Sequence, residues 1–496
     1  MSPSFHITTF GCKVNQYDGQ AVREALAAAG CDEAPLAGRP EFAIVNTCTL
    51  TAAADGKARR LIRRIARELP ECKIIVTGCM VSRDAAQFEK LPGVWRVFSN
   101  DEKPEIADIV ASEALGESVR LCAQTNTLPA TDTSPATGGV SGFAGRTRAF
   151  VKVQDGCDAC CTYCIVPSVR GKPRSRPMGE VLEEVRRLAG RFRDGRPNVR
   201  VTSQGGPECP PSPRSSIPGS GGGGHSVRRK RRGPPNSATP SDHTDIRAVT
   251  FREIVLTGIH VGLYRDESGA DLAALIRKVL DVSPVERVRL SSIGPEEITP
   301  DLVDLMARSP RFCPHFHIPL QSGSDRVLKR MGRRYTKDEF LAAIDFIRRE
   351  VDRPSITSDV IVGFPGETGD DFQRTADACR AAGFSRMHIF PFSERPGTAA
   401  AKMSGKCPAS IIAERKAALG AIASELALAF KRPFVGQTVD VLVETTRDRS
   451  GKLCGYTARY LRVLFDGDDS LKGEIVPVRI TDAEPAFLCG DLPEGA

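Results

Sequence analysis

The chain has 496 residues, a formal net charge of +8 and 16 cysteines, which is enough for two to four domains with a large buried core. Its first residues lack the apolar segment of a secretory signal, and no run of eighteen apolar residues occurs, so we expect neither secretion nor a membrane span. A soluble, cytoplasmic protein keeps its thiols reduced. Clustered cysteines in such a protein bind metal or take part in redox chemistry more often than they form disulfides.

The N-terminal region is predicted to alternate strands with helices. Each of its three β-rich segments ends in a cysteine: residues 5–12 at Cys12, residues 41–48 at Cys48 and residues 72–79 at Cys79. Amphipathic segments lie between them, and this alternation predicts a parallel sheet. Ligands of such a sheet bind beyond the carboxyl ends of its strands, which lie about 4.8 Å apart. We therefore expect the three cysteines to converge on one site; three separate buried apolar side chains are the alternative.

A polar segment rich in Thr, Pro and Gly, residues 123–142, is predicted to link this first domain, residues 1–122, to a second α/β domain, residues 143–430. The second domain contains six β-rich segments that close on polar or glycine-rich loops: residues 148–156, 251–262, 285–299, 315–325, 354–368 and 384–393. Such repeats predict a full or partial (βα) barrel with its chemistry at the carboxyl ends of the strands.

Residues 196–249 interrupt this pattern with a sequence rich in Pro, Gly, Ser and Arg. Because this composition buries too little apolar surface to fold, we expect a disordered insertion. Within it, residues 200–247 carry eight basic and three acidic side chains, which is +5 of the net charge. The last region, residues 431–496, has the short alternating strands of a small β-barrel. The predicted fold class is α/β, with an N-terminal parallel domain, a central partial barrel and a C-terminal β-barrel.

Four cysteines lie within eight positions of the stretch "VQDGCDACCTYCIVPSVRG", residues 153–171. Cys157, Cys161 and Cys164 form a CxxxCxxC pattern, without the second cysteine knuckle or histidine pair that a zinc site would need nearby. Three thiolates suit a four-iron cluster in which one iron stays open to another ligand. Cys160 lies outside this triad, and we predict that it binds no metal.

Further motifs accompany this pattern: "GCKVNQYD", "VNTC", "TGC", "EIVLTGIHVG", "LSSIGPEEI", "HIPLQSGSD" and "SDVIVGFPGET". Together they resemble the radical S-adenosylmethionine methylthiotransferases, and the C-terminal region is similar to their TRAM module, which binds RNA. The resemblance implies two [4Fe–4S] clusters. The catalytic triad Cys157, Cys161 and Cys164 would hold the cluster that binds S-adenosyl-L-methionine. Cys12, Cys48 and Cys79 would hold an auxiliary cluster.

The resemblance also implies which side chains surround the cofactor and what the reaction needs. Tyr163, Glu296 (or its neighbour Glu297), Gln321 and Asp359 are candidate contacts of S-adenosylmethionine, and loop-capping hydrogen bonds are their alternative role. A radical derived from S-adenosylmethionine would remove a hydrogen, which methylated sulfur would replace. Such an enzyme requires an electron donor and a sulfur source, and we expect a monomer.

Three substrates occur within this family: N6-threonylcarbamoyladenosine beside the tRNA anticodon, N6-isopentenyladenosine at the same place, and an aspartate of a ribosomal protein. Residues 12–16, "CKVNQ", are similar to the first group, whereas the others tend towards "CQMN" and "CPKN". The resemblance thus implies methylthiolation at C2 of N6-threonylcarbamoyladenosine in tRNA. The isopentenyl substrate and, from another class, a non-catalytic iron–sulfur protein that binds RNA remain alternatives.

Basic side chains are the candidates for contacts with tRNA. Lys13 and the basic segment around Arg60 are expected to meet phosphate or the carboxylate of the substrate, unless they form a solvated surface. In the C-terminal barrel we expect five exposed side chains to contact RNA: Arg447, Arg449, Lys452, Arg459 and Arg462.

Overall fold

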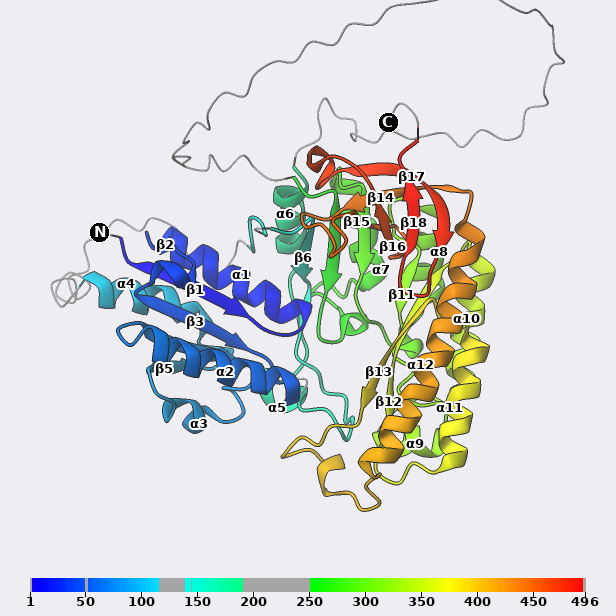
Figure 1. The fold of residues 1–496 in the computed structure, drawn as a ribbon, viewed down its shortest axis with the longest axis horizontal. Coiled ribbons are helices and arrows are strands. Elements are labelled where there is room, and N and C mark those ends of the chain that lie inside the picture. Colours follow the sequence, from blue (N-terminus) through cyan, green and yellow to red (C-terminus); the bar gives the residue numbers. More distant parts are fainter. Residues whose placement is uncertain (1, 50–51, 116–138, 144, 191–249, 494–496) are drawn as a thin grey trace, which may run out of the picture.

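The structure is a computed structural model that describes residues 2–49, 52–115, 139–143, 145–190 and 250–493 (Figure 1). Most of the predicted linker, residues 123–138, and the whole predicted insertion, residues 196–249, lie outside this described part of the chain. No helix in the described part is long and apolar enough to cross a membrane.

The N-terminal domain is a five-stranded parallel sheet covered by helices on both faces. The strands follow the order β2-β1-β3-β4-β5: Asp32–Glu33, Ser4–Thr9, Phe42–Thr47, Lys73–Gly78 and Val94–Phe98. The helices are α1 (Lys13–Ala28), α2 (Ala52–Glu68), α3 (Ala85–Glu89) and α4 (Ile106–Leu115). Side chains of α1 and α4 form one hydrophobic cluster with the sheet, and side chains of α2 and α3 form another. All six residues of the central strand β3 are buried, as expected for a strand covered on both faces.

The central domain is a partial barrel of six parallel strands in two sheets, each followed in sequence by polar loops. One sheet has the order β10-β9-β6, with β6 Arg148–Lys152, β9 Glu253–Thr257 and β10 Arg287–Leu290. The other has the order β11-β12-β13, with β11 His315–His317, β12 Ser355–Val362 and β13 Arg386–Pro391. Single β-bridges join Val288 of β10 to Phe312, which precedes β11, and Ser292 of the following loop to His317 of β11. All six predicted strands are present, and the predicted barrel is confirmed as a partial one.

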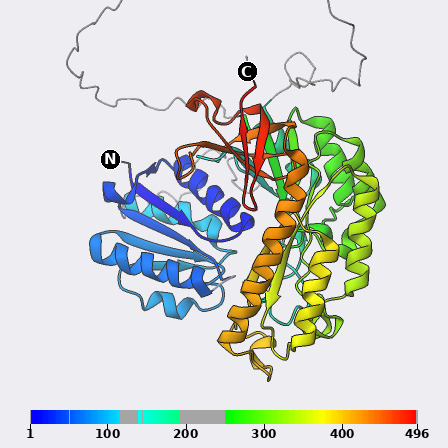
Figure 2. The ribbon, with the colours of Figure 1, turned by 45° about the vertical axis from the view of Figure 1, so that its right-hand side comes forward.

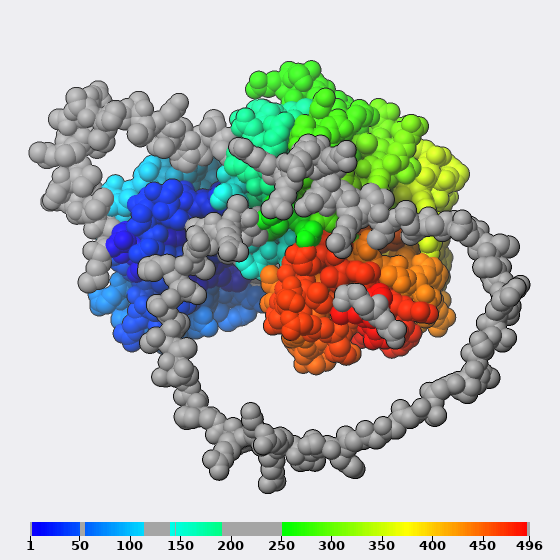
Figure 3. Space-filling model, turned by 90° about the horizontal axis from the view of Figure 1, so that it is seen from above, coloured from blue at the N-terminus to red at the C-terminus, as the bar shows by residue number. Residues whose placement is uncertain are grey.

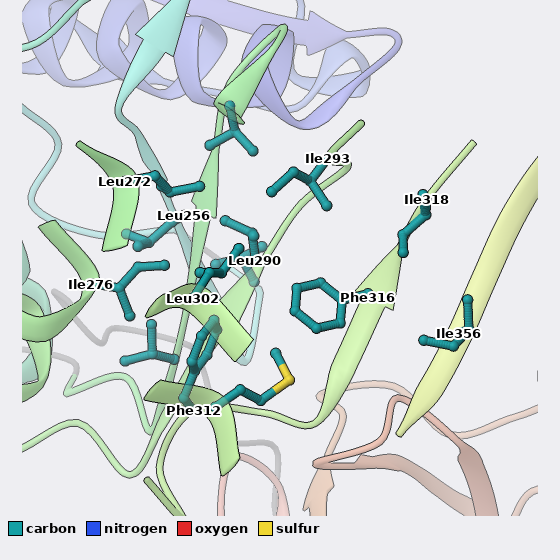
Figure 4. Packing of buried hydrophobic residues seen from close by; sticks show 14 of the residues in the cluster. Leu256, Leu272, Ile276, Leu290, Ile293, Leu302, Phe312, Phe316, Ile318 and Ile356 are labelled. Atoms are coloured by element: carbon teal, nitrogen blue, oxygen red, sulfur yellow. The ribbon is translucent and has the colours of Figure 1, made fainter. Parts of the chain in front are cut away.

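Helices cover the outside of this barrel: α6 (Met178–Ala189), α7 (Leu272–Val282), α8 (Pro300–Arg308), α9 (Asp325–Met331), α10 (Lys337–Glu350), α11 (Gly369–Ala382) and α12 (Ala409–Lys431). Figure 4 shows Leu256 and Leu290 of the strands packed towards Ile276 and Leu302 of the helices. The short strands β7 (Gln154–Asp155) and β8 (Arg174–Ser175) pair with each other, and helix α5 (Val166–Arg170) lies between them in the sequence. In Figure 2 the N-terminal domain, in blue, forms a lobe beside the central domain.

The C-terminal region forms a closed barrel in the order β14-β15-β16-β18-β17: Thr438–Val443, Leu453–Thr457, Arg462–Phe465, Leu488–Asp491 and Ile475–Ala483. It sits directly on the central domain (Figure 3). Arg287 and Arg289 donate to backbone carbonyls of this barrel at 2.8 to 3.3 Å. Arg459 donates in the other direction, to the carbonyl oxygens of Asp352 at 3.0 Å and Arg353 at 2.9 Å. Arg459, expected to be exposed for RNA, is half-buried, and its guanidinium joins the two domains.

Candidate active site

The three strand-end cysteines of the N-terminal domain follow three neighbouring strands. β1 pairs with β3 and β3 with β4, where Thr47 lies opposite Gly78. The register continues beyond the strands, because the backbone N–H of Cys79 donates to the carbonyl oxygen of Thr47 at 3.2 Å. Cys48 follows β3 directly in the same way, and Cys12, at the N-cap of α1, comes three residues after the end of β1. The structure thus brings these predicted ligands to one edge of the sheet.

Two residues of the segment "GCKVNQ" hold these strand ends close together. Gly11 has a left-handed backbone with φ of 103°, and a Cβ atom at this position would overlap the thiol of Cys48. Asn15 is completely buried, and its amide donates to the carbonyl oxygens of Phe10 at 2.6 Å and Thr47 at 3.1 Å. Glycine therefore permits the close approach of the two strand ends, and asparagine ties them together.

The second cysteine group lies in the loop after β7 and is anchored to α9. The backbone N–H of Thr162 donates to the carbonyl oxygen of Met331 at 2.9 Å, and its hydroxyl donates to that of Arg330 at 2.9 Å. Gly332 ends α9 with φ of 74°, and a side chain there would collide with the carbonyl oxygen of Cys160. Helix α9 thereby supports the middle of the cysteine loop.

The three predicted ligands of this loop each have a nitrogen atom next to the sulfur. These nitrogens are His260 Nδ1 at 3.6 Å from Cys157 Sγ, Arg333 Nη1 at 3.5 Å from Cys161 Sγ, and the backbone N–H of Val166 at 3.4 Å from Cys164 Sγ. Hydrogen bonds to sulfur tune an iron–sulfur cluster and orient its ligands. Cys160 differs, because it is exposed and its thiol points to the carbonyl oxygen of Asp158 at 3.7 Å.

The state of the thiols decides whether these two groups suit iron–sulfur clusters. All six cysteines are reduced. Burial raises the pKa of Cys164 to about 11, and the neighbouring Cys161 and Cys157 act in the same direction. Burial also raises the pKa of Cys12. Bound iron reverses this preference for the thiol, because a metal cation stabilises the thiolate.

The arrangement of the donors separates a cluster from a single metal ion. Among the described residues, no three Cys, His, Asp or Glu side chains converge on the position of one ion. A four-iron cluster binds each thiolate through a different iron atom, so its ligands surround a volume instead of a point. Two groups of three thiols, one at strand ends and one in a loop, without carboxylate ligands among them, therefore fit iron–sulfur clusters better than isolated ions.

Helix α5 connects the two cysteine groups. It begins two residues after Cys164, and Ile165 and Val169 pack against Cys79 of the other group. Arg170, at the end of the helix, donates from Nε to Cys79 Sγ at 3.4 Å. The two predicted triads consequently lie on either side of one short helix.

Arg170 also belongs to a buried network of charges that the sequence analysis did not identify. Asp18 accepts hydrogen bonds from Lys152 at 2.6 Å, Arg170 at 3.0 Å and Lys103 at 3.3 Å, and Asp155 pairs with Arg170 at 3.0 Å. Burial opposes ionisation of Asp18, but the three cations outweigh it and hold the pKa of Asp18 far below its usual range. Nothing in the sequence around Asp18 distinguishes it from a solvated helix residue.

Three of the candidate contacts of S-adenosylmethionine lie in the loops and strands of the central domain. Tyr163 packs edge-on against Phe364, with ring centroids 6.4 Å apart. Asp359 Oδ2 lies 3.3 Å from His317 Nε2. Gln321 has a left-handed backbone with φ of 62°, and its backbone N–H donates to the carbonyl oxygen of Asp359 at 2.9 Å. A strained non-glycine backbone of this kind is often retained at binding sites.

The two neighbouring glutamates have different environments. Glu296 is exposed. The carboxylate of Glu297 lies 2.5 Å from His260 Nε2 and accepts the backbone N–H of Gly294 at 2.9 Å. Glu297 is thus the glutamate that is connected through His260 to Cys157. Glu296, the first candidate for contact with S-adenosylmethionine, has no such connection among the described residues.

A cavity of about 390 Å³ lies where the three domains meet. Its charged and aromatic lining comes from each domain: Lys13; Arg146, Arg148 and Arg289; Glu444 and Tyr460. Desolvation lowers the pKa of Lys13 to about 8, and the cations Arg289 and Arg148 act in the same direction. Cavities of this size hold small molecules or substituents of larger ones.

The architecture itself is similar to that of known iron–sulfur enzymes. A radical S-adenosylmethionine methyltransferase, TsrM from Kitasatospora setae, superimposes with a TM-score of 0.50 over 81% of this chain and 77% of that chain, at 15% sequence identity. This likeness concerns the fold alone. A partial (βα) barrel with a three-cysteine loop after its first strand defines the class of radical S-adenosylmethionine enzymes.

Sequence comparisons narrow this class. Family models match residues 4–99 (uncharacterized protein family UPF0004), 241–379 (radical SAM superfamily) and 432–492 (TRAM domain). A threonylcarbamoyladenosine tRNA methylthiotransferase of Thermotoga maritima is 34% identical over 99% of this chain and 98% of its own length. A tRNA-2-methylthio-N(6)-dimethylallyladenosine synthase of Pelotomaculum thermopropionicum is 31% identical over 98% and 97%. The chain belongs to the radical S-adenosylmethionine tRNA methylthiotransferase family, which implies S-adenosylmethionine and a [4Fe–4S] cluster as cofactors.

Proposed function

We propose that this protein adds a methylthio group to C2 of N6-threonylcarbamoyladenosine beside the tRNA anticodon. Relatives that carry this name are 30% to 34% identical over nearly the whole chain. Relatives named for the dimethylallyl substrate are 30% to 32% identical, so that substrate is the second candidate. The motif "CKVNQ" at residues 12–16 supports the first.

The observation that carries the enzymatic part of this proposal is the contact of both cysteine groups with helix α5. In this assignment Cys157, Cys161 and Cys164 hold the cluster that binds S-adenosylmethionine, and Cys12, Cys48 and Cys79 hold a second cluster. When bound, these groups supply the one-electron chemistry that removes hydrogen from an unactivated C–H and the sulfur that replaces it, for which amino-acid side chains have no equivalent. An external electron donor and a sulfur source complete the reaction.

The side chains of the protein bind and orient in this scheme. Tyr163, in the cysteine loop, packs against the fully buried Phe364, which holds the tyrosine ring in place. His260 is held by Glu297 and keeps its other ring nitrogen next to Cys157. Arg170 places its guanidinium next to Cys79 and can neutralise negative charge on that sulfur. The C-terminal barrel is proposed to hold the tRNA, whose phosphates would make that binding sensitive to salt.

Mass spectrometry of tRNA nucleosides tests the substrate directly. Cells that lack this protein should lose the methylthio derivative of N6-threonylcarbamoyladenosine, and the gene should restore it, while a variant with Cys12, Cys48 and Cys79 changed to alanine should not. Loss of the dimethylallyl derivative instead would transfer the proposal to the second candidate. If the reduced, reconstituted protein fails to cleave S-adenosylmethionine, a non-catalytic RNA-binding role takes its place.

A further inference from the structure

The cavity between the three domains has more positive than negative charge. Arg289 pairs with Glu253 at 2.7 Å, and Arg148 pairs with Glu444. Both carboxylates are thus engaged by arginines. Lys13 has no ion-pair partner in the described part of the chain, although it is partly buried. A buried charge without a counter-charge is costly, and a ligand that supplies the opposite charge removes this cost.

Arg148, a second cation of the same cavity, has one nitrogen without a hydrogen-bond acceptor in the described part of the chain. Arg148 Nη1 is buried and has no hydrogen-bond acceptor among the described residues. Its guanidinium lies over Tyr460, 5.5 Å from the ring centroid, and Arg289 lies over the same ring at 4.7 Å. The aromatic ring fixes both cations from the side of the C-terminal barrel. The cavity wall therefore carries Lys13, which has no ion-pair partner among the described residues, and the Arg148 guanidinium, one nitrogen of which has no acceptor there.

We propose that Lys13 and Arg148 bind the carboxylate that the threonylcarbamoyl substituent of the target adenosine carries, so that this cavity selects an anionic over a neutral N6 substituent. The inference rests on the proposed function and names the part of the protein that distinguishes its two candidate substrates. The threonyl group ends in a carboxylate, whereas the dimethylallyl group is an uncharged hydrocarbon. A cavity that contains the cation Lys13, unpaired within the described residues, stabilises the carboxylate of the first substituent, whereas the second substituent offers that cation no acceptor.

The position of the cavity suits a substituent on N6. Lys13 directly follows Cys12, a proposed ligand of the auxiliary cluster, so the cavity adjoins the proposed site of sulfur transfer. In adenine, C2 and the N6 group are attached to the same six-membered ring, and a group on N6 therefore lies near the carbon that reacts. The cavity wall includes Val255 and Arg289, which are buried inside the barrel. A substituent of a flipped-out base reaches such a place more readily than a phosphate of a continuous backbone.

Lys13→Met tests the proposal, because Lys13 has no ion-pair partner among the described residues that its removal would disrupt. The cluster-loaded protein is titrated with one tRNA in three forms: with the threonylcarbamoyl group, with its carboxylate converted to the methyl ester, and with the dimethylallyl group. The unchanged protein should bind the carboxylate form more tightly than the other two. Lys13→Met should weaken binding of the carboxylate form by roughly 10- to 100-fold and leave the other two unchanged. Lys13→Arg, which keeps the charge, should retain most of the preference.

Lys278→Met, at an exposed position on α7, is the matched control and should change none of the three affinities. If Lys13→Met weakens all three forms equally, Lys13 contacts a backbone phosphate and the proposal is wrong. An unchanged preference for the carboxylate form would also overturn it. Failure of the unchanged protein to methylthiolate the threonylcarbamoyl tRNA would refute the proposed reaction, while the three affinities would still report on the cavity.

Discussion

At the scale of single residues, the surroundings of the cysteines differ between the predicted ligands of the loop and Cys160. Cys157 and Cys161 have nitrogen donors beside their sulfur atoms, whereas Cys160 is exposed and turned to a backbone carbonyl. Arg170 likewise places a nitrogen donor beside the sulfur of Cys79, and it also pairs with the carboxylate of Asp18. A sulfur atom next to nitrogen donors accommodates the negative charge of a thiolate, and Cys160 has no such donor among the described residues.

The pair Cys160→Ala and Cys161→Ala tests the register of the loop. Cys160→Ala should retain about eight irons per chain and the cleavage of S-adenosylmethionine, since two four-iron clusters remain. Cys161→Ala should lose about half of the iron and all of the cleavage, because one cluster lacks a ligand. Iron analysis and a cleavage assay without tRNA measure both. The reverse result for the two variants would show that Cys160 is the ligand.

Arg170→Met should destabilise the protein strongly, because it leaves the buried carboxylate of Asp18 and the half-buried carboxylate of Asp155 with fewer counter-charges. Removal of one partner from a buried ion pair costs about 3 to 5 kcal/mol of the free energy of unfolding. Denaturant unfolding of the reduced protein measures this change. Arg174→Met removes an exposed pair with Asp101 and should change the free energy of unfolding by about 0.5 kcal/mol or less. Equal effects of the two substitutions would contradict the importance of the buried network.

At the scale of elements, the residues at the ends of the strands, more than those in the middle, decide where the cysteines lie. β1, β3 and β4 would form the same sheet with many apolar sequences, but Gly11 and Asn15 set the approach of their carboxyl ends. The same holds for α9, whose final Gly332 lies against the cysteine loop. Close contacts between backbone segments require glycine or another small residue. These contacts decide where the cysteines meet.

Gly11→Ala should displace Cys48 and reduce the iron content by about half, since the auxiliary site loses a ligand. Gly30→Ala is a matched control, because Gly30 also has a left-handed backbone, with φ of 81°, but no atom within 4 Å of an added Cβ. That control should cost only about 1 kcal/mol of backbone strain and keep its iron. Iron content that falls equally in both variants would mean that backbone strain, and not overlap with Cys48, is responsible.

Replacement of residues 191–249 by a short Gly/Ser linker should preserve the fold and the iron content. The backbone N–H of Phe251 donates to the carbonyl oxygen of Leu188 at 2.9 Å, so the end of α6 and the start of β9 are already joined. A loop whose ends are in contact is removed at little energetic cost. Thermal unfolding and iron analysis of the shortened protein test this expectation, which aggregation or loss of iron would contradict.

At the scale of the whole molecule, the C-terminal barrel packs against the central domain and is also the domain proposed to bind tRNA. Arg287, Arg289 and Arg459 tie it to the central domain. Of the side chains proposed for RNA, Arg447 and Lys452 pair with acidic neighbours. Arg449 is exposed and has no ion-pair partner within the described residues. Removal of the entire barrel would therefore mix effects on RNA binding with effects on stability.

Single substitutions separate these two roles. Arg449→Ala should weaken tRNA binding and reduce the slope of log affinity against log salt by about one, as expected for a lost phosphate contact. Arg459→Ala should leave that slope unchanged and lower the melting temperature, because it loosens the barrel from Asp352 and Arg353. Titrations with tRNA at several salt concentrations, together with thermal unfolding, distinguish the two. An unchanged slope for Arg449→Ala would exclude it from the RNA surface.

The sequence by itself determined the order of the three domains, the parallel sheet with cysteines at its strand ends, the six barrel strands and the CxxxCxxC loop. These features depend on hydrophobic period and on the spacing of neighbouring residues, which a linear pattern contains. It missed the short strands β2 and β5, since the paired neighbour matters more than the local sequence for such strands.

The tertiary structure alone decided which charged residues are buried and with which partners. Asp18 meets Arg170, Lys13 shares a cavity with Arg148 and Arg289, and Arg459 reaches Asp352. These pairs join residues more than a hundred positions apart and, for the cavity, three domains. A helix or strand pattern reveals that one face is polar, but the packing of another domain against that face decides whether its charges meet water, a counter-charge or a substrate.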